Sequence, residues 1–242
     1  MELSIVIPAY NESRKIKNDV FAADRFIHDN FRTGQIIVVD DGSDDATSEI
    51  VSSLKEEIRT ELIAIRLDKN NGKGAAIKEG VKVSTGEFIL YADAGLTVPF
   101  KDALTGIELI SVNKCDIANG SRKLAESNIV KKQDLDRRII SQIFGKLVKL
   151  FFHIPKRITD TQCGFKIYNG QVARELFPLL KINGFLFEIE FILLALKKGY
   201  RILDFPVTWN CDRDSRLSVK KSSKSIISEF IKLFKEFNKS SF

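Results

Sequence analysis

The stretch QIIVVDD, residues 35–41, places four consecutive apolar residues directly before two aspartates. A short apolar run with polar residues at both ends is typical of a strand that is buried in a sheet. Runs of the same kind are SIVIP at residues 4–8, ELIAIRL at residues 61–67 and EFILY at residues 87–91. The first hundred residues therefore predict four buried strands.

Segments with helical periodicity lie between these strands. Residues 12–30 repeat apolar side chains at helical spacing, and residues 74–83 do the same after a turn that contains glycine. After the second strand, Ser43 or Asp44 is expected to act as the N-cap of a further helix. Strands that alternate with helices predict an α/β fold, in which a mainly parallel sheet carries helices on both faces.

The second half of the chain has a less regular pattern. We expect strands at residues 116–120, 164–168 and 201–208. We expect helices at residues 136–153, 171–176, 187–198 and 222–238, of which the last is basic and amphipathic.

The composition limits the class of protein. The 242 residues are 44% hydrophobic and suit one large α/β domain with a sizeable core. The formal net charge of +6 favours an acidic partner, such as a phosphate-rich ligand or an anionic membrane surface. No nucleic acid is expected as a partner, because the basic residues come without a recognition helix or an aromatic RNA-binding motif.

The cysteines and the apolar runs bear on the compartment. Three cysteines lie far apart, without a CxxC pair, which favours a reducing, intracellular setting. The N-terminus does not have the pattern of a signal peptide, and no run of about 20 apolar residues predicts a membrane-spanning helix.

Polar residues follow three of the predicted strands at the point where each strand ends. They are Pro8–Glu12, Asp40–Ser43 and Asp93–Gly95. The carboxyl ends of parallel strands meet at one edge of a sheet, where ligands bind. Carboxylates at this edge can accept hydrogen bonds from a ribose or a base, or hold a divalent cation beside a diphosphate. Such residues also form turns and caps, but three clusters in register favour a binding site.

The segment NNGKG, residues 70–74, follows the third strand. Its glycines permit a ligand to approach the backbone, and Lys73 can meet a phosphate. The alternative is an ordinary turn with a solvated lysine. Since no GxGxxG follows the first strand and no P-loop motif occurs, a dinucleotide and a P-loop nucleotide are disfavoured. The residues favour a nucleoside diphosphate with a group attached.

Several motifs resemble those of the family-two glycosyltransferases, which have a GT-A fold. They are SIVIPAYNE, VVDDGSDDAT and NGKGAAIKEG. A second set resembles the dolichyl-phosphate β-glucosyltransferase branch and its polyprenyl-phosphate relatives: DTQCGFKIY, GSR, FEIE, and VTWN followed by DSRLS. The resemblance covers residues 3–218.

This resemblance implies an enzyme, a hexosyltransferase. The reaction would be inverting transfer of a hexose, glucose in this branch, from UDP-hexose to a polyprenyl or dolichyl phosphate. A transferase that uses GDP-mannose or another nucleotide-sugar is one alternative. A nucleotide-sugar-binding module without turnover is another.

Carried onto this chain, the resemblance implies one site. Asp41 would face the uracil or ribose, Lys73 would lie near the base or diphosphate, and Asp93 would be the catalytic residue and metal ligand. Three arginines would grip the acceptor phosphate or the leaving diphosphate. The full substrate-binding set is Pro8, Ala9, Tyr10, Glu12, Asp41, Lys73, Asp93, Arg122, Arg138 and Arg216.

One position departs from the family pattern. Relatives usually carry Asp-Ala-Asp after the fourth strand, and the second Asp binds Mg²⁺ or Mn²⁺, whereas this chain has Asp93-Ala94-Gly95. Mg²⁺ or Mn²⁺ is still the expected cofactor, held by Asp93, diphosphate oxygens and water. The alternatives are a substitute ligand elsewhere, or neutralisation of the diphosphate by Lys or Arg without a metal.

Other candidate residues have a structural alternative. Asp160, Glu188 and Glu190 are candidates for binding the sugar or acting as a base, or for making structural hydrogen bonds. Trp209 is expected in the core, with stacking on a sugar as the alternative. Cys163 is expected to be a small buried residue.

We expect residues 1–218 to form the GT-A domain, with a nucleotide-sugar-binding half at 1–100 and an acceptor half at 101–218. Residues 219–242 are expected to form a basic amphipathic helix. This helix can pack on the domain, lie on a membrane surface, or pair with a second copy to form a homo-oligomer. The expected location is the cytoplasm, peripherally on the cytoplasmic membrane face.

Overall fold

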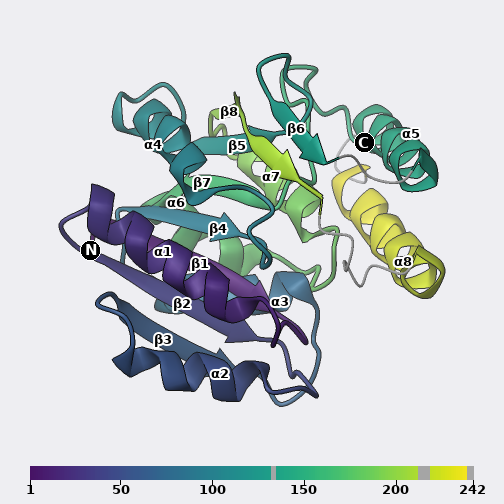
Figure 1. Ribbon diagram of the computed structural model, residues 1–242. Coiled ribbons are helices and arrows are strands. Elements are labelled where there is room, and N and C mark those ends of the chain that lie inside the picture. The colour runs from purple at the N-terminus through teal and green to yellow at the C-terminus, as the bar shows by residue number, and fades with distance from the viewer. Residues whose placement is uncertain (132–134, 212–218, 239–242) are drawn as a thin grey trace.

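The computed structural model describes residues 1–131, 135–211 and 219–238, and the side chains of residues 1–131, 143–211 and 225–237 (Figure 1). A seven-stranded sheet with the order β3-β2-β1-β4-β7-β5-β8 runs through it. Its strands are β1 (Leu3–Ala9), β2 (Gly34–Asp40), β3 (Glu61–Arg66), β4 (Phe88–Ala92), β5 (Ile117–Ser121), β7 (Phe165–Asn169) and β8 (Ile202–Pro206).

The sheet is mainly parallel, as predicted. Strand β1 pairs in parallel with β2 and β4, so that Ile5 lies between Ile36 and Leu90. Strand β7 is the exception, because it is antiparallel to both of its neighbours, β4 and β5. It joins the strands of the first half to those of the second in one continuous sheet.

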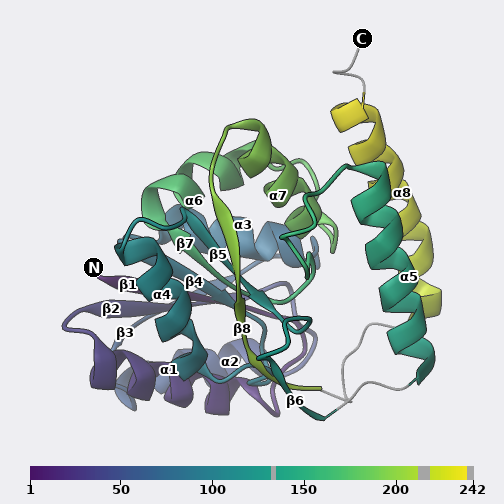
Figure 2. The same ribbon diagram turned by 90° about the horizontal axis from the view of Figure 1, so that it is seen from above.

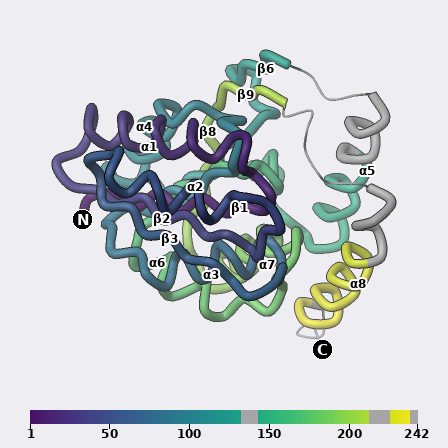
Figure 3. Tube along the Cα trace, turned by 60° about the horizontal axis from the view of Figure 1, so that its bottom comes forward, coloured from purple at the N-terminus to yellow at the C-terminus, as the bar shows by residue number. Residues whose placement is uncertain are grey.

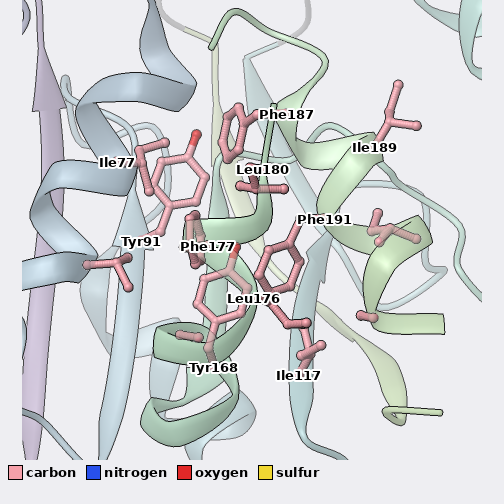
Figure 4. Packing of buried hydrophobic residues seen from close by; sticks show 14 of the residues in the cluster. Ile77, Tyr91, Ile117, Tyr168, Leu176, Phe177, Leu180, Phe187, Ile189 and Phe191 are labelled. Atoms are coloured by element: carbon pink, nitrogen blue, oxygen red, sulfur yellow. The ribbon is translucent and has the colours of Figure 1, made fainter. Parts of the chain in front are cut away.

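Helices cover both faces of the sheet (Figure 2). On one face α1 (Ile16–Asn30), α2 (Thr47–Ser53) and α4 (Ala103–Ser111) bury one apolar cluster. On the other, α3 (Lys73–Val83), α6 (Gly170–Leu176) and α7 (Phe187–Lys197) bury a second cluster, rich in aromatic rings (Figure 4). Within it, Tyr168 and Phe191 lie with ring centroids 4.8 Å apart. Short 3₁₀ turns are Leu54–Glu56, Phe100–Asp102 and Phe177–Leu179.

The structure differs from the predicted elements in a few places. The predicted strand at 201–208 divides into β8 and β9 (Thr208–Asn210), and β9 pairs with β6 (Asn128–Lys131) in a small second sheet (Figure 3). Neither β6 nor α4 was predicted. The capping prediction is wrong, because α2 begins at Thr47 and its N-cap, Ala46, has no side-chain cap.

Two long helices lie side by side at one end of the molecule (Figures 1 and 2). They are α5 (Leu135–Phe151) and α8 (Val219–Asn238), and α8 is the predicted C-terminal helix. Phe230 of α8 packs edge-on against Phe144 of α5 and against Phe152 just beyond it, with centroids 6.5 and 5.2 Å away. Over the described residues, no helix combines the length and apolarity needed to cross a membrane.

Candidate functional site

The loops after β1 and β2 are joined by hydrogen bonds at the carboxyl edge of the sheet. The backbone amide of Asn11 donates to the Ser43 hydroxyl at 2.8 Å, and the Asp44 amide donates to the Asn11 side chain at 2.8 Å. The Ser43 hydroxyl in turn donates to Asp40. Ser43 therefore links two loops instead of capping a helix. Residues 8–12 are placed at this edge, as the sequence predicted.

Asp41 fixes the turn that precedes α3. Its two carboxylate oxygens accept hydrogen bonds from the Asn71 and Gly72 amides, each at 2.8 Å. Burial raises the pKa of Asp41, and these two hydrogen bonds act against the rise. Gly72 has φ +102°, and a Cβ there would lie 2.5 Å from the Asn183 carbonyl oxygen, so the turn requires glycine. A contact of Asp41 with uracil or ribose stays a prediction.

Lys73 and Asp93 meet across this edge. The Lys73 ammonium lies 2.7 Å from Asp93 Oδ1 and 5.3 Å from the centre of the Tyr91 ring. The Tyr91 hydroxyl donates to the same carboxylate oxygen at 2.6 Å. Burial lowers the pKa of Lys73, but the charges of Asp93 and Glu188 outweigh it, so the pKa lies above its ordinary value. Two residues that were predicted separately for the site therefore form an ion pair with each other.

Gly164, in the motif DTQCGFKIY, lies directly against Asp93. The Asp93 amide donates to the Gly164 carbonyl at 2.9 Å. A Cβ at Gly164 would overlap the Asp93 carboxylate, so glycine is needed for Asp93 to occupy this position. This contact was not predicted from the sequence, because Gly164 lies 71 positions after Asp93 in the chain.

Asp19 is a functional candidate that the sequence analysis missed. Its buried carboxylate, 1% exposed, accepts from the Gly95 amide at 2.9–3.0 Å and from the Leu96 amide at 2.8 Å. Burial raises the pKa of Asp19 to about 7. The signal was present, since Asp19 follows Ile16 at helical spacing and thus lies on the apolar face of α1.

Arg122, which is partly exposed, and the buried Asp160 form an ion pair on the other side of β7. Arg122 donates from Nε to Asp160 at 2.6 Å and from Nη2 at 2.9 Å, and its guanidinium lies 5.3 Å from the Trp209 ring centre. Burial would raise the pKa of Asp160, but the Arg122 charge holds it well below its usual range. The Trp209 ring thus lies against an arginine. Asp160 has a structural role, which was the alternative to binding the sugar or acting as a base.

Comparison with known proteins decides the family. Residues 4–177 match the profile of glycosyl transferase family 2. The chain belongs to this family. It is 32% identical over 241 residues to the dolichyl-phosphate β-glucosyltransferase of Dictyostelium discoideum, covering 96% of this chain and 73% of that enzyme. Another enzyme of this name, ALG5C from Trichomonas vaginalis, is 34% identical over 93% of this chain and 68% of its own length.

Solved structures confirm the predicted GT-A fold of this glycosyltransferase. Glucosyl-3-phosphoglycerate synthase from Mycobacterium tuberculosis, in complex with Mn²⁺, UDP and phosphoglyceric acid, superposes with a TM-score of 0.71 at 14% identity. The match covers 96% of this chain and 78% of the synthase. The same synthase with Mg²⁺ and UDP has a TM-score of 0.69 at 15% identity. Divalent cations thus occur with UDP in proteins of this fold.

The transferase itself fits a divalent cation poorly. Among the described residues, no three His, Cys, Asp or Glu side chains gather into a group that could hold a metal ion. Asp93 is already paired with the Lys73 ammonium, and Gly95 supplies no carboxylate. An ion bound at Asp93 would meet a like charge from Lys73.

The remaining acidic candidates of the transferase have structural partners. Glu188, 4% exposed, pairs with Lys166 of β7 at 2.6 Å. Glu190 accepts hydrogen bonds from the Lys181 and Ile182 amides at 2.8–3.0 Å. Burial raises the pKa of Cys163 to about 12, which agrees with a buried residue that is not a nucleophile.

Two predicted arginines of the transferase lie wholly or partly outside the described residues. Arg138 belongs to α5, where the structure describes its backbone but not its side chain. Arg216 lies outside the described residues altogether.

Proposed function

We propose that this chain transfers glucose from UDP-glucose to a dolichyl or polyprenyl phosphate with inversion at the sugar. The proposal rests on the carboxyl edge of the sheet, where Asp41, Lys73 and Asp93 converge from three loops of a GT-A fold. The glucosyl group and the dolichyl phosphate are taken from the names of relatives that align with 86–96% of the chain, and UDP from a solved structure of the same fold. Residues 1–100 would bind the donor and residues 101–218 the acceptor.

The reaction needs little help from a base. A phosphate monoester carries about −1.5 to −2 charges at pH 7, so its oxygen can attack the anomeric carbon directly. A bond forms between that oxygen and the sugar, and the bond from the sugar to the diphosphate breaks to release UDP. The protein must align the reactants and stabilise the leaving diphosphate. This demand agrees with Asp160 and Glu188 being engaged in ion pairs.

The residues of the proposed site have distinct roles. Asp41 positions the turn before α3, and Pro8, Ala9, Tyr10 and Glu12 border the nucleotide. Asp93 faces the ribose and diphosphate, and Lys73 the diphosphate. Arg122, which Asp160 and Trp209 hold at the far side of β7, faces the acceptor phosphate. Arg138 and Arg216 are proposed for the same phosphates on the resemblance alone.

A donor panel tests the activity. The full chain is incubated with a polyprenyl phosphate and UDP-glucose, UDP-galactose, UDP-GlcNAc or GDP-mannose, and the lipid product is measured. We expect product from UDP-glucose. Product from GDP-mannose alone would favour the mannosyl alternative, and tight UDP-glucose binding without any product would favour the binding module.

Asp93→Ala should weaken UDP binding, and unchanged affinity would remove Asp93 from the site.

A membrane surface is the proposed partner of α5 and α8. Their inner sides pack together through aromatic rings, yet large apolar side chains remain exposed on the outside. These are Ile143, Leu147 and Leu150 on α5, and Ile227 and Ile231 on α8, with exposed fractions of 43–70%. Lys146, Lys232 and Lys235 lie exposed among them. Apolar residues interleaved with lysines suit an anionic lipid surface near a lipid acceptor.

Surface substitutions test this partner better than a deletion, because Phe230 and Leu233 of α8 pack into the protein. We expect Ile227→Ser with Ile231→Ser to reduce sedimentation with anionic vesicles while the thermal midpoint stays near that of the parent. The matched control is Leu104→Ser, at a 41% exposed leucine on α4. Unchanged vesicle binding would reject the membrane contact. If the parent forms a dimer and the same substitutions make it a monomer, the partner of this surface is a second copy of the chain. The cytoplasmic membrane face is the proposed location.

A further inference from the structure

Position 95 lacks a side chain, and its backbone is held in a conformation that disfavours one. Gly95 has φ +92°, in the region that favours glycine. The buried Asp19 carboxylate accepts the Gly95 and Leu96 amides and fixes this turn. Asp93 is the one acidic residue of the segment 93–96.

Asp93 already has a cation beside it. Lys73 lies 2.7 Å from Oδ1, and its side chain is only 21% exposed. Lys73 is also the first residue of α3, where the positive end of the helix dipole adds to its charge. Asp41 holds the preceding turn, so the ammonium is placed by the fold.

The charge balance of this edge differs from that of a two-carboxylate site. One ammonium and one carboxylate cancel, so the Lys73–Asp93 pair has no net charge. A second carboxylate at position 95 would add a negative charge to those of Asp41 and Asp93 at this edge, and would repel a diphosphate more strongly unless a cation joined it. Glycine avoids this added repulsion. A diphosphate can then approach Lys73 without a divalent ion.

We propose that this transferase holds the donor diphosphate without a divalent cation, and that Lys73 supplies the compensating positive charge. The inference rests on the proposed nucleotide-sugar donor. Lys73 lies beside Asp93 at the carboxyl edge of the sheet, and an ammonium there can stabilise the negative charge that develops on a leaving diphosphate. Asp93 keeps the ammonium in place, and Asp19 fixes the turn at Gly95 that follows Asp93.

Calorimetric titration of the full chain with UDP is the first test. We expect the dissociation constant in excess EDTA to agree within about twofold with that in excess Mg²⁺ or Mn²⁺. Affinity that rises about tenfold or more with either metal would overturn the inference while leaving the donor site standing. Absence of UDP and UDP-glucose binding under every condition would instead reject the proposed function.

Lys73→Gln is the second test, with Lys82→Gln as its control. Lys82 lies on the same helix, is 73% exposed at its side chain and pairs with Glu79. In EDTA, Lys73→Gln should weaken UDP binding about tenfold or more, and Lys82→Gln should leave it unchanged. Equal affinities of Lys73→Gln and the parent would overturn the inference, provided that their circular dichroism and thermal midpoints agree.

Gly95→Asp and Gly95→Ala form a matched pair, because both meet the same backbone strain and only one adds a carboxylate. In EDTA, Gly95→Asp should bind UDP more weakly than Gly95→Ala, and Mn²⁺ should restore binding in Gly95→Asp alone. Electron paramagnetic resonance should show Mn²⁺ bound to the UDP complex of Gly95→Asp. The UDP complex of the parent should bind no more Mn²⁺ than UDP does by itself. Identical behaviour of the two variants would contradict the charge argument.

Discussion

Single glycines decide the geometry of the donor edge. Gly164 admits the Asp93 carboxylate, Gly72 admits the Asn183 carbonyl, and Gly95 adopts a positive φ. At the first two positions a Cβ would meet an atom of a residue distant in sequence. The chemistry of Lys73 and Asp93 thus depends on residues that carry no functional group.

Gly164→Ala should displace Asp93. The added methyl overlaps the carboxylate, so we expect UDP affinity to fall about tenfold or more and stability to fall by about 1–3 kcal/mol. Calorimetry with UDP and urea unfolding measure the two effects. Gly145→Ala is the control, since its methyl would meet only Lys123 Nζ at an ordinary 3.5 Å. Wild-type affinity in Gly164→Ala would mean that Asp93 does not contribute to binding.

Asp19 should make stability depend on pH. Its folded pKa of about 7 lies above the ordinary 3.8, so the folded state prefers the protonated carboxyl. This contribution is fully present below about pH 4 and is lost as pH rises to about 7. Relative to Asp19→Asn, the parent should lose up to about 4 kcal/mol of unfolding free energy across this window, measured in urea. A difference that is constant with pH would contradict burial as the dominant influence.

Among the elements, α5 and α8 form a pair with two apolar sides. Phe230 contacts Phe144, Phe151 and Phe152 on the inner side. Glu229 of α8 accepts a hydrogen bond from the Leu186 amide at 3.1 Å, and Lys181 donates one to Glu236 of α8 at 2.6 Å. These two contacts join α8 to the loop before α7. The same loop contacts α3, because the Ala75 amide donates to Asn183. Helix α8 is therefore linked through this loop to α3, which begins at Lys73 of the donor site.

The two sides of α8 should respond differently to truncation. Phe230→Ala removes ring contacts to three phenylalanines and should lower the unfolding free energy by about 2–3 kcal/mol. Ile227→Ala, at a side chain 58% exposed, should change it by about 0.5 kcal/mol or less. Urea unfolding followed by circular dichroism measures both. Equal losses would show that α8 does not pack as described.

At the scale of the molecule, β7 holds the two halves together. It lies antiparallel between β4 of the first half and β5 of the second. Lys166 on this strand donates to the Cys163 carbonyl and pairs with Glu188 of α7, with both side chains at most 4% exposed. A charge pair is thus enclosed in the interior at the junction.

Lys166→Met should destabilise the whole protein by about 3–5 kcal/mol, because it leaves the Glu188 carboxylate buried without its partner. The double variant Lys166→Met with Glu188→Leu should recover most of this loss, since burying two apolar groups avoids the desolvation cost of a charge. Urea unfolding of the parent, both single variants and the double variant gives the coupling. A double variant that loses the sum of both single effects would contradict this.

The sequence by itself determined the parallel first half of the sheet, the order of its helices and the motifs at its carboxyl edge. Short apolar runs and helical periodicity are local patterns, so the strands from SIVIP to EFILY and the long helices could be predicted within a few residues. The family also followed from local motifs. Helix α4 and strand β6 were missed because their patterns are short and mixed.

Only the tertiary structure decided how those motifs meet. The antiparallel insertion of β7 brings Gly164 beneath Asp93, and the packing of α1 brings Asp19 to the Gly95 turn. The pairing of Arg122 with Asp160 and of Lys166 with Glu188 likewise joins residues more than 20 positions apart. Such contacts depend on which elements become neighbours in the sheet and on which charges must find a partner when water is excluded, and neither is encoded in a local pattern.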